Sequence, residues 1–349
     1  MTKNSILPIY SVSGSNYEIG FQIGKTLKPQ IIDFLEKSKR LKFLRKAERK
    51  NPRLQKLVEY GERYFPQYME EIRGITHGSD SNLTDIFLIN GKYDFPRNGC
   101  TTVIFRDAHG IILGHNEDNT KENLNNCCLL KVYPDVGTPF ISFCYPGMVP
   151  GNSFAFNAHG IVITNNSMPT PDIRIGCPRH LIDRFQLEAK NARDAITRTL
   201  LKERASGGSF NIVSQKEKRA VNIETTSQRY CLTEVEDKYL HTNHYVSKEL
   251  SSLKKDESSL RSSISRYEVG SKLLRKVKEK TPQPALDILT SLEAEPYSIL
   301  RIDRRMRFCT LFTALFDVSS EGIILKVYEP NPRIQEKDAF LELASDDLM

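Results

Sequence analysis

From residue 16 to about 95 the chain carries the hydrophobic spacing of helices. Leucine and isoleucine recur at three- and four-residue steps in the first half of this region, which suits one helix with one buried stripe. Asn51–Pro52 should break that helix, because proline is tolerated only in a first helical turn. A second helix is then predicted through residues 54–72, with Gly74 and Gly78 marking its end.

The pattern changes at Gly99, where short runs of β-branched and aromatic residues begin to alternate with turn residues. Residues 101–105 and 111–114 are predicted to be two strands joined by a turn at 107–110. Further strands are predicted at 129–133, 140–145, 153–157, 161–165, 209–213, 220–224, 230–234, 309–317 and 322–328. Helical spacing returns over two segments, residues 178–204 and 247–294.

The elements therefore follow the order helices, hairpins, helices, strands, helices, strands. Segregated runs of this kind favour an α+β layered fold over a βαβ alternation around a parallel sheet. A chain of 349 residues can bury one large core or two modest ones. No repeat of about 20–50 residues interrupts this organisation.

Positive charge is concentrated in one segment of a chain whose net charge is +7. Residues 37–56 are rich in lysine and arginine, opposed only by Glu48. This segment is either a solvent-exposed helix face or a binding surface for an anion such as a coenzyme A phosphate. Nucleic acid is not expected as a partner, because the segment offers a single phenylalanine on which bases could stack.

Cysteine usage and hydropathy set expectations for the cellular compartment. Seven thinly spread cysteines, an odd number, favour reduced thiols over a disulfide framework. No window approaches the roughly 18 apolar residues that span a bilayer. Residues 1–6 lack the apolar stretch of a secretory signal, and residues 347–349 are not a peroxisomal address. We therefore expect a cytoplasmic protein with no membrane span.

Four short segments carry residues suited to catalysis. They are residues 98–102 (NGCTT), 114–119 (GHNEDN), 241–245 (HTNHY) and 304–307 (RRMR). Each is weak alone, since a buried cysteine is usually an inert small hydrophobe. Their functional interpretation depends on the order in which all four occur along the chain.

The chain resembles the acyl-coenzyme A:isopenicillin N (6-aminopenicillanic acid) acyltransferase family. These are peptidase C45-like members of the cysteine N-terminal nucleophile (Ntn) hydrolases. Residues 14–24 match the family's opening glycine motif, and residues 71–75 match the end of its leader helix. Residues 99–102 match its self-cleavage junction. The acidic hairpin, the Thr-Asn-His motif and a late arginine follow in the expected order, so the resemblance covers nearly the whole chain.

The resemblance implies a four-layer αββα sandwich, in which two packed sheets carry helices outside. It also implies self-cleavage between Gly99 and Cys100. The products would be a helical fragment, 1–99, and a catalytic fragment, 100–349, which stay associated as an α/β heterodimer within one Ntn-hydrolase domain. No cofactor is expected.

The implied mechanism centres on Cys100. Its thiol would attack the carbonyl of Gly99, where the absence of a Cβ permits close approach. Hydrolysis of the resulting thioester frees the α-amine of Cys100. An α-amine titrates at about 7.7–8.0, so it can act as general base toward its own thiol.

Three further residues take roles from the resemblance. Asp118 would hold the new ammonium and thiol in register, and Asn243 would offer its amide to the oxyanion, a donor worth roughly 3–4 kcal/mol. Arg307 matches the late arginine and would add positive charge, although Arg305 is close enough to be confused with it. Each residue could instead have a purely structural role. Asp118 could cap a turn, Asn243 could be an amide whose hydrogen bonds are all made within the fold, and Arg307 could form a surface ion pair.

His115 departs from the family pattern. Many relatives carry arginine or glutamine at this position, three residues before Asp118. A histidine is smaller and can lose its charge near physiological pH. We expect His115 to be a possible substrate contact, with specificity that differs from that of those relatives.

A metal centre is the first rival interpretation. His241 and His244 share a three-residue spacing with Cys177 and His180, but zinc needs three or four ligands in paired short motifs. Asn243 interrupts the first pair and is predicted to lie in a strand, where positions i and i+3 point to opposite faces. We expect no metal, and we expect Cys127–Cys128 to serve packing.

The second rival is a non-catalytic or dormant uncleaved relative that acts as a binding protein. Retention of Cys100, Asp118 and Asn243 argues against it. If the protein is an enzyme, a hydrolase and an acyltransferase would form the same acyl-enzyme intermediate. Attack by water on that intermediate gives hydrolysis, and attack by an amine gives acyl transfer. The sequence does not decide between them. A small-molecule linear amide or acyl-CoA thioester is the expected substrate.

Overall fold

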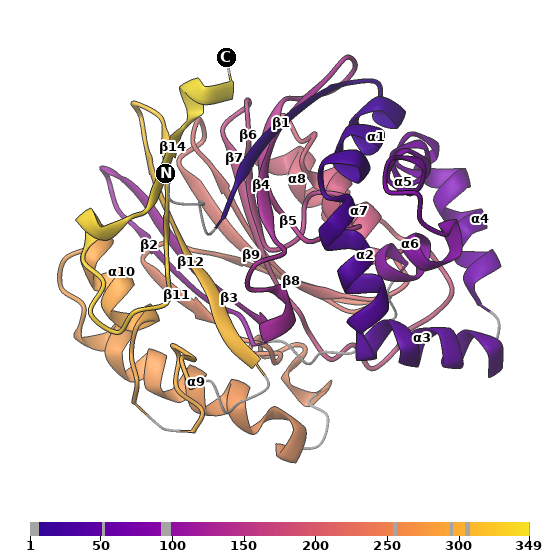
Figure 1. The fold of residues 1–349 in the computed structure, drawn as a ribbon. Helices are drawn as coiled ribbons and strands as arrows, with labels where there is room; N and C mark the ends of the chain where they lie inside the picture. Colours follow the sequence, from indigo (N-terminus) through magenta and orange to yellow (C-terminus); the bar gives the residue numbers. More distant parts are fainter. Residues whose placement is uncertain are drawn as a thin grey trace.

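Two β-sheets pack face to face and helices cover both outer surfaces (Figure 1). The computed structural model describes residues 7–50, 53–91, 99–253, 257–293, 296–303 and 308–348. The layers run helix, sheet, sheet, helix. The predicted α+β class and four-layer αββα arrangement are therefore confirmed.

The larger sheet has eight strands in the order β1-β4-β5-β6-β7-β8-β9-β10. All neighbours are antiparallel except β1, which runs parallel to β4. The strands are β1 (Ile9–Gly14), β4 (Cys128–Pro134), β5 (Phe140–Cys144), β6 (Phe154–Asn157), β7 (Ile161–Asn166), β8 (Gly208–Ser214), β9 (Arg219–Thr225) and β10 (Tyr230–Glu234). All but β1 match strands predicted from the sequence.

The smaller sheet has six antiparallel strands in the order β11-β2-β3-β12-β13-β14. They are β11 (Lys238–His241), β2 (Thr101–Arg106), β3 (Gly110–Thr120), β12 (Phe308–Ser319), β13 (Ile323–Tyr328) and β14 (Leu341–Ala344). The predicted hairpin turn is confirmed, because the Asp107 carboxylate accepts from the backbone of His109 and Gly110. Strand β14 was not predicted, and the strand expected at Asn243 is wrong, because β11 ends at His241.

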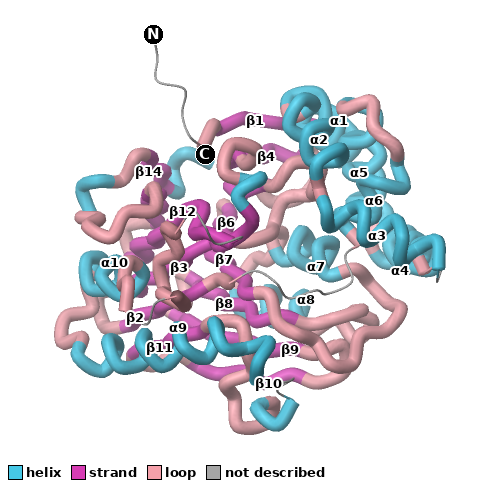
Figure 2. The backbone as a smooth tube through the Cα atoms, turned by 60° about the horizontal axis from the view of Figure 1, so that its bottom comes forward, coloured by secondary structure: helices cyan, strands magenta, loops and turns pink. Residues whose placement is uncertain are grey.

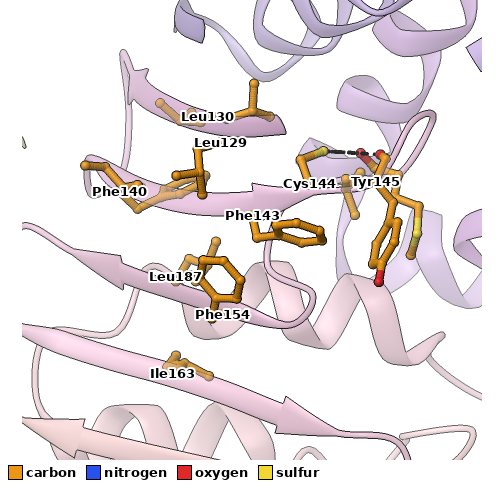
Figure 3. Packing of buried hydrophobic residues seen from close by; sticks show 14 of the residues in the cluster. Leu129, Leu130, Phe140, Phe143, Cys144, Tyr145, Phe154, Ile163 and Leu187 are labelled. Atoms are coloured by element: carbon orange, nitrogen blue, oxygen red, sulfur yellow. Dashed lines mark hydrogen bonds between the residues drawn. The ribbon is translucent and has the colours of Figure 1, made fainter. Parts of the chain in front are cut away.

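The main core lies between the two sheets. Rings of β5 and β6 meet rings of β12: the Phe143 and Phe312 centroids lie 6.1 Å apart, and those of Phe154 and Phe316 lie 6.4 Å apart. Figure 3 shows Phe143 and Phe154 packed with their neighbours in this layer. Full burial of each ring contributes roughly 1.5–3 kcal/mol.

A second core forms on the outer face of the smaller sheet, beneath α9 (Glu257–Lys276) and α10 (Pro282–Leu289) (Figure 2). The period-two alternation of β2 divides its side chains between the layers. Ile104 faces the larger sheet, whereas Val103 and Phe105 face the helices. Both faces of the smaller sheet are thus buried, and α9 and α10 come directly over the strands that flank Cys100.

The other helices lie on the side of the larger sheet. They are α1 (Asn16–Thr26), α2 (Lys28–Lys37), α3 (Lys39–Lys50), α4 (Leu54–Tyr64), α5 (Pro66–Gly78), α6 (Leu83–Asn90), α7 (Arg179–Gln186) and α8 (Ala192–Thr199). Among them, α1 and α8 contact strands of that sheet, and α3 and α4 pack on α5 and α6. None of the helices among the described residues is both long and apolar enough to cross a bilayer.

Two of the predicted helix boundaries are wrong. The single helix expected through residues 54–72 is two helices, because Pro66 cannot donate the backbone bond that would continue α4 and instead begins α5. The single helix expected before residue 51 is three, interrupted at Leu27 and Ser38. Gly78 ends α5 as predicted, Gly74 lies inside it, and Asn51–Pro52 falls outside the described residues.

The opening glycine motif sets the crossing of α1 and α5. A Cβ on Gly20 would lie 2.0 Å from the Glu71 carbonyl oxygen, and one on Gly74 would lie 2.1 Å from that of Tyr17. Such distances are far inside van der Waals contact. Only glycine at these positions lets the two helix backbones approach this closely.

Candidate active site

Cys100 lies directly before β2 and its side chain is buried, with 3% exposure. Strands β2 and β3 pair Thr101 with Asn116, so the same register places Cys100 opposite Glu117. The Cys100 thiol donates to Oε2 of Glu117 at 3.3 Å. The sulfur thus faces a carboxylate on the neighbouring strand.

Glu117 collects hydrogen bonds from three other side chains. Oε2 accepts from Oγ of Ser153 at 2.8 Å and lies 3.4 Å from Nε2 of His115, while Oε1 accepts from the Tyr145 hydroxyl. Burial alone would raise the pKa of Glu117, but the hydrogen bonds from His115, Tyr145 and Ser153 outweigh it and lower that pKa. Glu117 is therefore a buried carboxylate.

Ser153 reaches Glu117 from a strained backbone. Its φ of 74° lies in the left-handed region, which non-glycine residues rarely adopt. Strain of this kind costs on the order of 1–3 kcal/mol and persists where the surrounding structure enforces it. Here the enforced conformation directs a hydroxyl donor at the carboxylate beside the thiol.

The surroundings hold Cys100 as a thiol. Burial, and then the negative charges of Glu117 and Asp118, raise its pKa well above the usual range. The backbone N–H of Asp118 opposes this shift by donating to the sulfur. A thiolate here needs either a base or the loss of a neighbouring negative charge.

Asp118 points away from Glu117, toward the helices over the smaller sheet. Its Oδ1 accepts from Oγ1 of Thr310 at 2.7 Å, and its Oδ2 lies 3.4 Å from Nε of Arg301. Burial raises the pKa of Asp118 to about 6, although Arg301 and Arg266 act to lower it. The carboxylate is consequently poised between its two protonation states in a weakly acidic solution.

Gly99 lies close to the Arg301 guanidinium. A Cβ on Gly99 would lie 2.7–2.8 Å from the Arg301 guanidinium. The residue before Cys100 thus lies against a positive charge that also borders Asp118. Any larger residue at position 99 would have to displace that guanidinium.

Arg266 of α9 connects Cys100 to Asn243. Its Nη1 donates to the Cys100 carbonyl oxygen at 2.7 Å and to Oγ1 of Thr101 at 2.8 Å, and its Nη2 donates to Oδ1 of Asn243 at 2.7 Å. Burial, followed by repulsion from Arg301, lowers the pKa of Arg266 to about 9. One buried guanidinium therefore fixes both Cys100 and Asn243.

Asn243 lies just after β11 with its amide oriented from both ends. Oδ1 accepts from Arg266, Nδ2 donates to the Ser167 carbonyl oxygen at 2.9 Å, and the backbone N–H donates to Oγ of Ser263. Ser167 lines the same cavity as Cys100. Asn243 is thus held at the edge of the space that a substrate would enter.

The cavity beside Cys100 has a volume of about 340 Å³. Glu117 and Tyr145 line its inner end, and Phe34, Leu41 and Leu44 give it an apolar wall. Lys37 and Lys39, at the junction of α2 and α3, line it as well. The basic segment singled out in the sequence therefore borders the same cavity as the candidate nucleophile.

The structure brings four of the sequence-predicted residues together: Cys100 and His115 contact Glu117, while Asp118 and Asn243 lie on the side of the two arginines. Arg305 and Arg307 lie outside the described residues.

Three residues of the site were not predicted: Glu117, Arg266 and Arg301. Glu117 could have been found from the strand register, since Cys100 continues the pairing of Thr101 with Asn116. Neither arginine stands in a motif, and only the tertiary fold brings them to Cys100.

His241 and His244, considered above as metal ligands, contact other side chains of the protein instead. Nε2 of His241 lies 2.8 Å from Oε1 of Glu224, and Nδ1 of His244 lies 2.8 Å from Oγ of Ser263. Within the part of the chain that the structure describes, the group with ligand atoms close enough to share an ion is Cys100, His115 and Glu117.

Comparison with known proteins identifies the family. The profile of the acyl-coenzyme A:6-aminopenicillanic acid acyl-transferase family matches residues 105–333. The chain belongs to this family. The resemblance drawn from the sequence motifs is thereby confirmed, and the matched region begins just after the Gly99–Cys100 junction.

Two curated relatives support the assignment to the acyl-transferase family. The β-alanyl-dopamine/carcinine hydrolase of Drosophila melanogaster is 27% identical over 259 residues, covering 64% of this chain and 66% of the relative. The 40 kDa form of the acyl-coenzyme A:6-aminopenicillanic-acid-acyltransferase of Emericella nidulans is 26% identical over 246 residues, covering 66% and 67%. The chain thus spans about two thirds of each relative, slightly less for the first.

A solved structure was also matched. It is a mutant of the conjugated bile acid hydrolase from Clostridium perfringens, with a TM-score of 0.40 and 8% sequence identity. The match covers 70% of this chain and 96% of that protein.

Proposed function

We propose that the chain is an autoproteolytically activated cysteine amidohydrolase or acyltransferase that works through an acyl-Cys100 intermediate. The observation that carries the proposal is the buried Cys100 thiol, which follows Gly99, donates to Glu117 and lines a cavity. Membership of the acyl-transferase family supports the same chemistry. Linear amides and acyl thioesters are the proposed substrates.

Activation begins at Gly99. Sγ of Cys100 loses its proton toward Glu117 and forms a bond to the Gly99 carbonyl carbon, and the C–N bond to Cys100 breaks. The proton passes to the departing nitrogen, which becomes the α-amine. Water then hydrolyses the thioester, releasing fragment 1–99 with a free carboxylate and fragment 100–349 with Cys100 at its N-terminus.

In turnover the new α-amine takes the thiol proton and Sγ attacks the substrate carbonyl. The Asp118 carboxylate holds the ammonium that results, and the Asn243 amide donates to the oxyanion. Arg307 keeps its proposed role as the family's late arginine. Arg266 and Arg301 add fixed positive charge beside the nucleophile, where Arg266 holds the Cys100 carbonyl.

The cavity suggests the substrate class. Its apolar wall, which includes Phe34 and Leu44, suits a modest apolar acyl group, and Lys37 and Lys39 suit the phosphates of an acyl-CoA donor. The relatives are named as a hydrolase and as an acyl-coenzyme A acyltransferase, and both reactions can share one acyl-enzyme. Water or an amine would resolve it. His115, buried beside Glu117, influences substrate binding through that carboxylate.

The proposal extends to assembly and location. The two fragments remain together as an α/β heterodimer, supported by the pairing of β1 with β4 across the fragment boundary. A cytoplasmic location is favoured because all seven cysteines are free.

Catalysis is tested by substituting Asn243 and Asp118. Asn243→Ala should lower kcat by roughly 10²–10³, the typical effect of losing one oxyanion donor. Asp118→Asn should also lose most turnover. Rates would be measured with a panel of linear amides and acyl-CoA esters, and the acyl group would be located on Cys100 by peptide mass spectrometry. Asn331→Ala, on an exposed loop, is the matched control. Full turnover in both active-site variants would remove these residues from the mechanism.

Coenzyme A binding is tested by charge reversal at the cavity. Lys37→Glu combined with Lys39→Glu should weaken acyl-CoA binding, and the loss should shrink as salt screens the interaction. Lys216→Glu, in the exposed turn after β8, controls for net charge. Binding that is indifferent to both changes would exclude a phosphate contact there.

A further inference from the structure

Cys100, His115 and Glu117 present three metal-ligand atoms to one small volume. The Cys100 sulfur lies 3.3 Å from Oε2 of Glu117, and Nε2 of His115 lies 3.4 Å from the same oxygen. All three atoms lie within 4.8 Å of one another. Tetrahedral zinc, with bonds of about 2.0–2.3 Å, separates its ligands by about 3.3–3.6 Å. Two of the three separations already match.

The hydrogen bond of Nδ1 directs the other ring nitrogen of His115, Nε2, into this volume. Thr102 has one hydroxyl proton and donates it to Oδ1 of Asn166 at 2.9 Å. The 2.8 Å contact between Nδ1 of His115 and Oγ1 of Thr102 must therefore be a bond donated by the imidazole. Nε2 is then the ring nitrogen that faces Glu117, and loss of the proton it donates to Oε2 leaves a lone pair directed into the same volume. Metal-binding histidines are commonly fixed by such a bond from the other ring nitrogen.

Glu117 is oriented in the same way. The Tyr145 hydroxyl holds Oε1, and Ser153 donates to Oε2, which keeps a further lone pair for an ion. A proton on Nε2 joins His115 to Oε2 of Glu117 across 3.4 Å, and a cation bound by both atoms would take the place of that proton. The three side chains thus form an oriented, buried and electron-rich group with mixed nitrogen, oxygen and sulfur ligands.

We propose that Cys100, His115 and Glu117 form a binding site for a divalent transition-metal ion of the zinc type. The ion replaces the thiol proton and the proton that Nε2 shares with Glu117, both of which are released to solvent, and binds Sγ, Nε2 and Oε2. The cavity that reaches Cys100 and Glu117 supplies the entry path and a water molecule as fourth ligand. Nitrogen and sulfur ligands favour zinc over magnesium or calcium.

Occupancy inhibits the protein. A sulfur bound to zinc cannot attack the Gly99 carbonyl or a substrate, so the ion would suspend both self-cleavage and turnover until a chelator removes it. This consequence rests on the proposed function, whereas binding of the ion itself does not.

Cobalt absorption tests the site directly. The full-length chain, freed of metal by dialysis against a chelator, would be titrated with Co²⁺. We expect one equivalent to produce a thiolate-to-cobalt charge-transfer band and the intense visible bands of four-coordinate Co²⁺, with Zn²⁺ displacing both. Absence of the charge-transfer band from the wild-type chain would overturn the proposal.

Substitutions assign the ligands. Cys100→Ser should abolish the charge-transfer band, and His115→Gln should weaken Co²⁺ binding by more than the roughly 10–100-fold that loss of a supporting hydrogen bond costs. Cys231→Ser and His109→Gln, outside the site, should leave affinity unchanged. Circular dichroism checks folding, and Cys100→Ser decides the matter if His115→Gln does not fold. A band that survives Cys100→Ser would overturn the assignment.

Self-cleavage with and without Zn²⁺ separates this proposal from the proposed function. Cleavage that stops with Zn²⁺ and resumes with a chelator supports both. Equal cleavage in both conditions overturns the inhibitory site and leaves the proposed function intact. A metal-free chain that never cleaves contradicts the proposed function, while the cobalt spectrum still supports or overturns the metal site.

Discussion

At Cys100 the nearest acceptor for the thiol proton is the carboxylate of Glu117, and no histidine donates to or accepts from the sulfur among the described residues. Before cleavage the α-amine that would serve as base is still an amide. The carboxylate thus has two opposing effects. It accepts the thiol proton, and its charge raises the pKa of that thiol. A slow single cleavage event tolerates this arrangement better than repeated turnover would.

Glu117→Gln should make Cys100 easier to ionise. The wild-type thiol has a raised pKa, so its thiolate forms only at high pH, and removal of a neighbouring negative charge shifts ionisation to lower pH. We expect the half-maximal rate of Cys100 alkylation by iodoacetamide to move down by at least about one pH unit. The rate would be followed by peptide mass spectrometry on chains in matched cleavage states.

Glu321→Gln, in the exposed turn before β13, is the control and should leave the alkylation profile of Cys100 unchanged. A profile for Glu117→Gln that stays in place, or moves to higher pH, would show that the Glu117 charge does not govern the thiol.

Part of the candidate site could be predicted from the residue types in the sequence motifs. Cys100, Asp118 and Asn243 stand in recognisable motifs, and the structure places them around one buried cluster. Arg266 stands in a serine-rich stretch of α9 that carries no motif, and it reaches Cys100 only because that helix packs over β11. Long-range contacts of this kind leave no local pattern in a sequence.

At the scale of elements, the α1–α5 crossing depends on four glycines. Gly20 and Gly24 of α1 face Gly74 and Gly78 of α5, and each pair is spaced by four residues, which puts both glycines on one helix face. This packing brings α5 against α1 and positions Glu71, whose carboxylate contacts α7.

Gly74→Ala should destabilise the protein through this crossing. Its Cβ would lie 2.1 Å from the Tyr17 carbonyl oxygen, which is backbone and cannot swing aside. Overpacking of this kind costs about 3 kcal/mol, the upper end of its usual range. Urea unfolding measures the change, with Lys25→Ala on the exposed face of α1 as control. An unchanged midpoint in Gly74→Ala would mean that the helices separate readily.

Most elements could be predicted from the sequence, because hydrophobic period and turn residues are local signals. The errors have one local cause and one long-range cause. The Phe65–Pro66 step breaks a helix that the leucine spacing alone would continue, and β1 and β11 are short strands whose pairing partners lie more than a hundred residues away. Strand formation at those two positions is decided by the partner.

At the scale of the whole molecule, the segments before and after Gly99 share one structure. Strand β1 adds a parallel edge to the larger sheet through β4. Arg184 of α7 donates to Glu71 of α5 at 3.1 Å, both fully buried, with its guanidinium between the rings of Tyr68 and Phe140. Cutting the chain at residue 99 would leave these contacts intact.

The cleaved fragments should therefore elute as one species under native conditions and separate only in denaturant. Arg184→Met should lower the urea concentration at which they separate, because it leaves Glu71 buried without its partner, a loss of about 3–5 kcal/mol. Combining it with Glu71→Leu should restore much of that loss. Fragments that separate without denaturant would contradict a shared core, and a double variant no better than the single one would contradict the ion-pair explanation.

Self-cleavage at Gly99–Cys100 is the central claim, and the denatured mass spectrum of the purified chain tests it most directly. The wild-type chain should give two masses, corresponding to residues 1–99 and 100–349, and so should Cys231→Ala. Cys100→Ala should give one mass for the intact chain. A wild-type chain that stays whole after long incubation in a metal chelator would contradict the account and point to a dormant or binding protein.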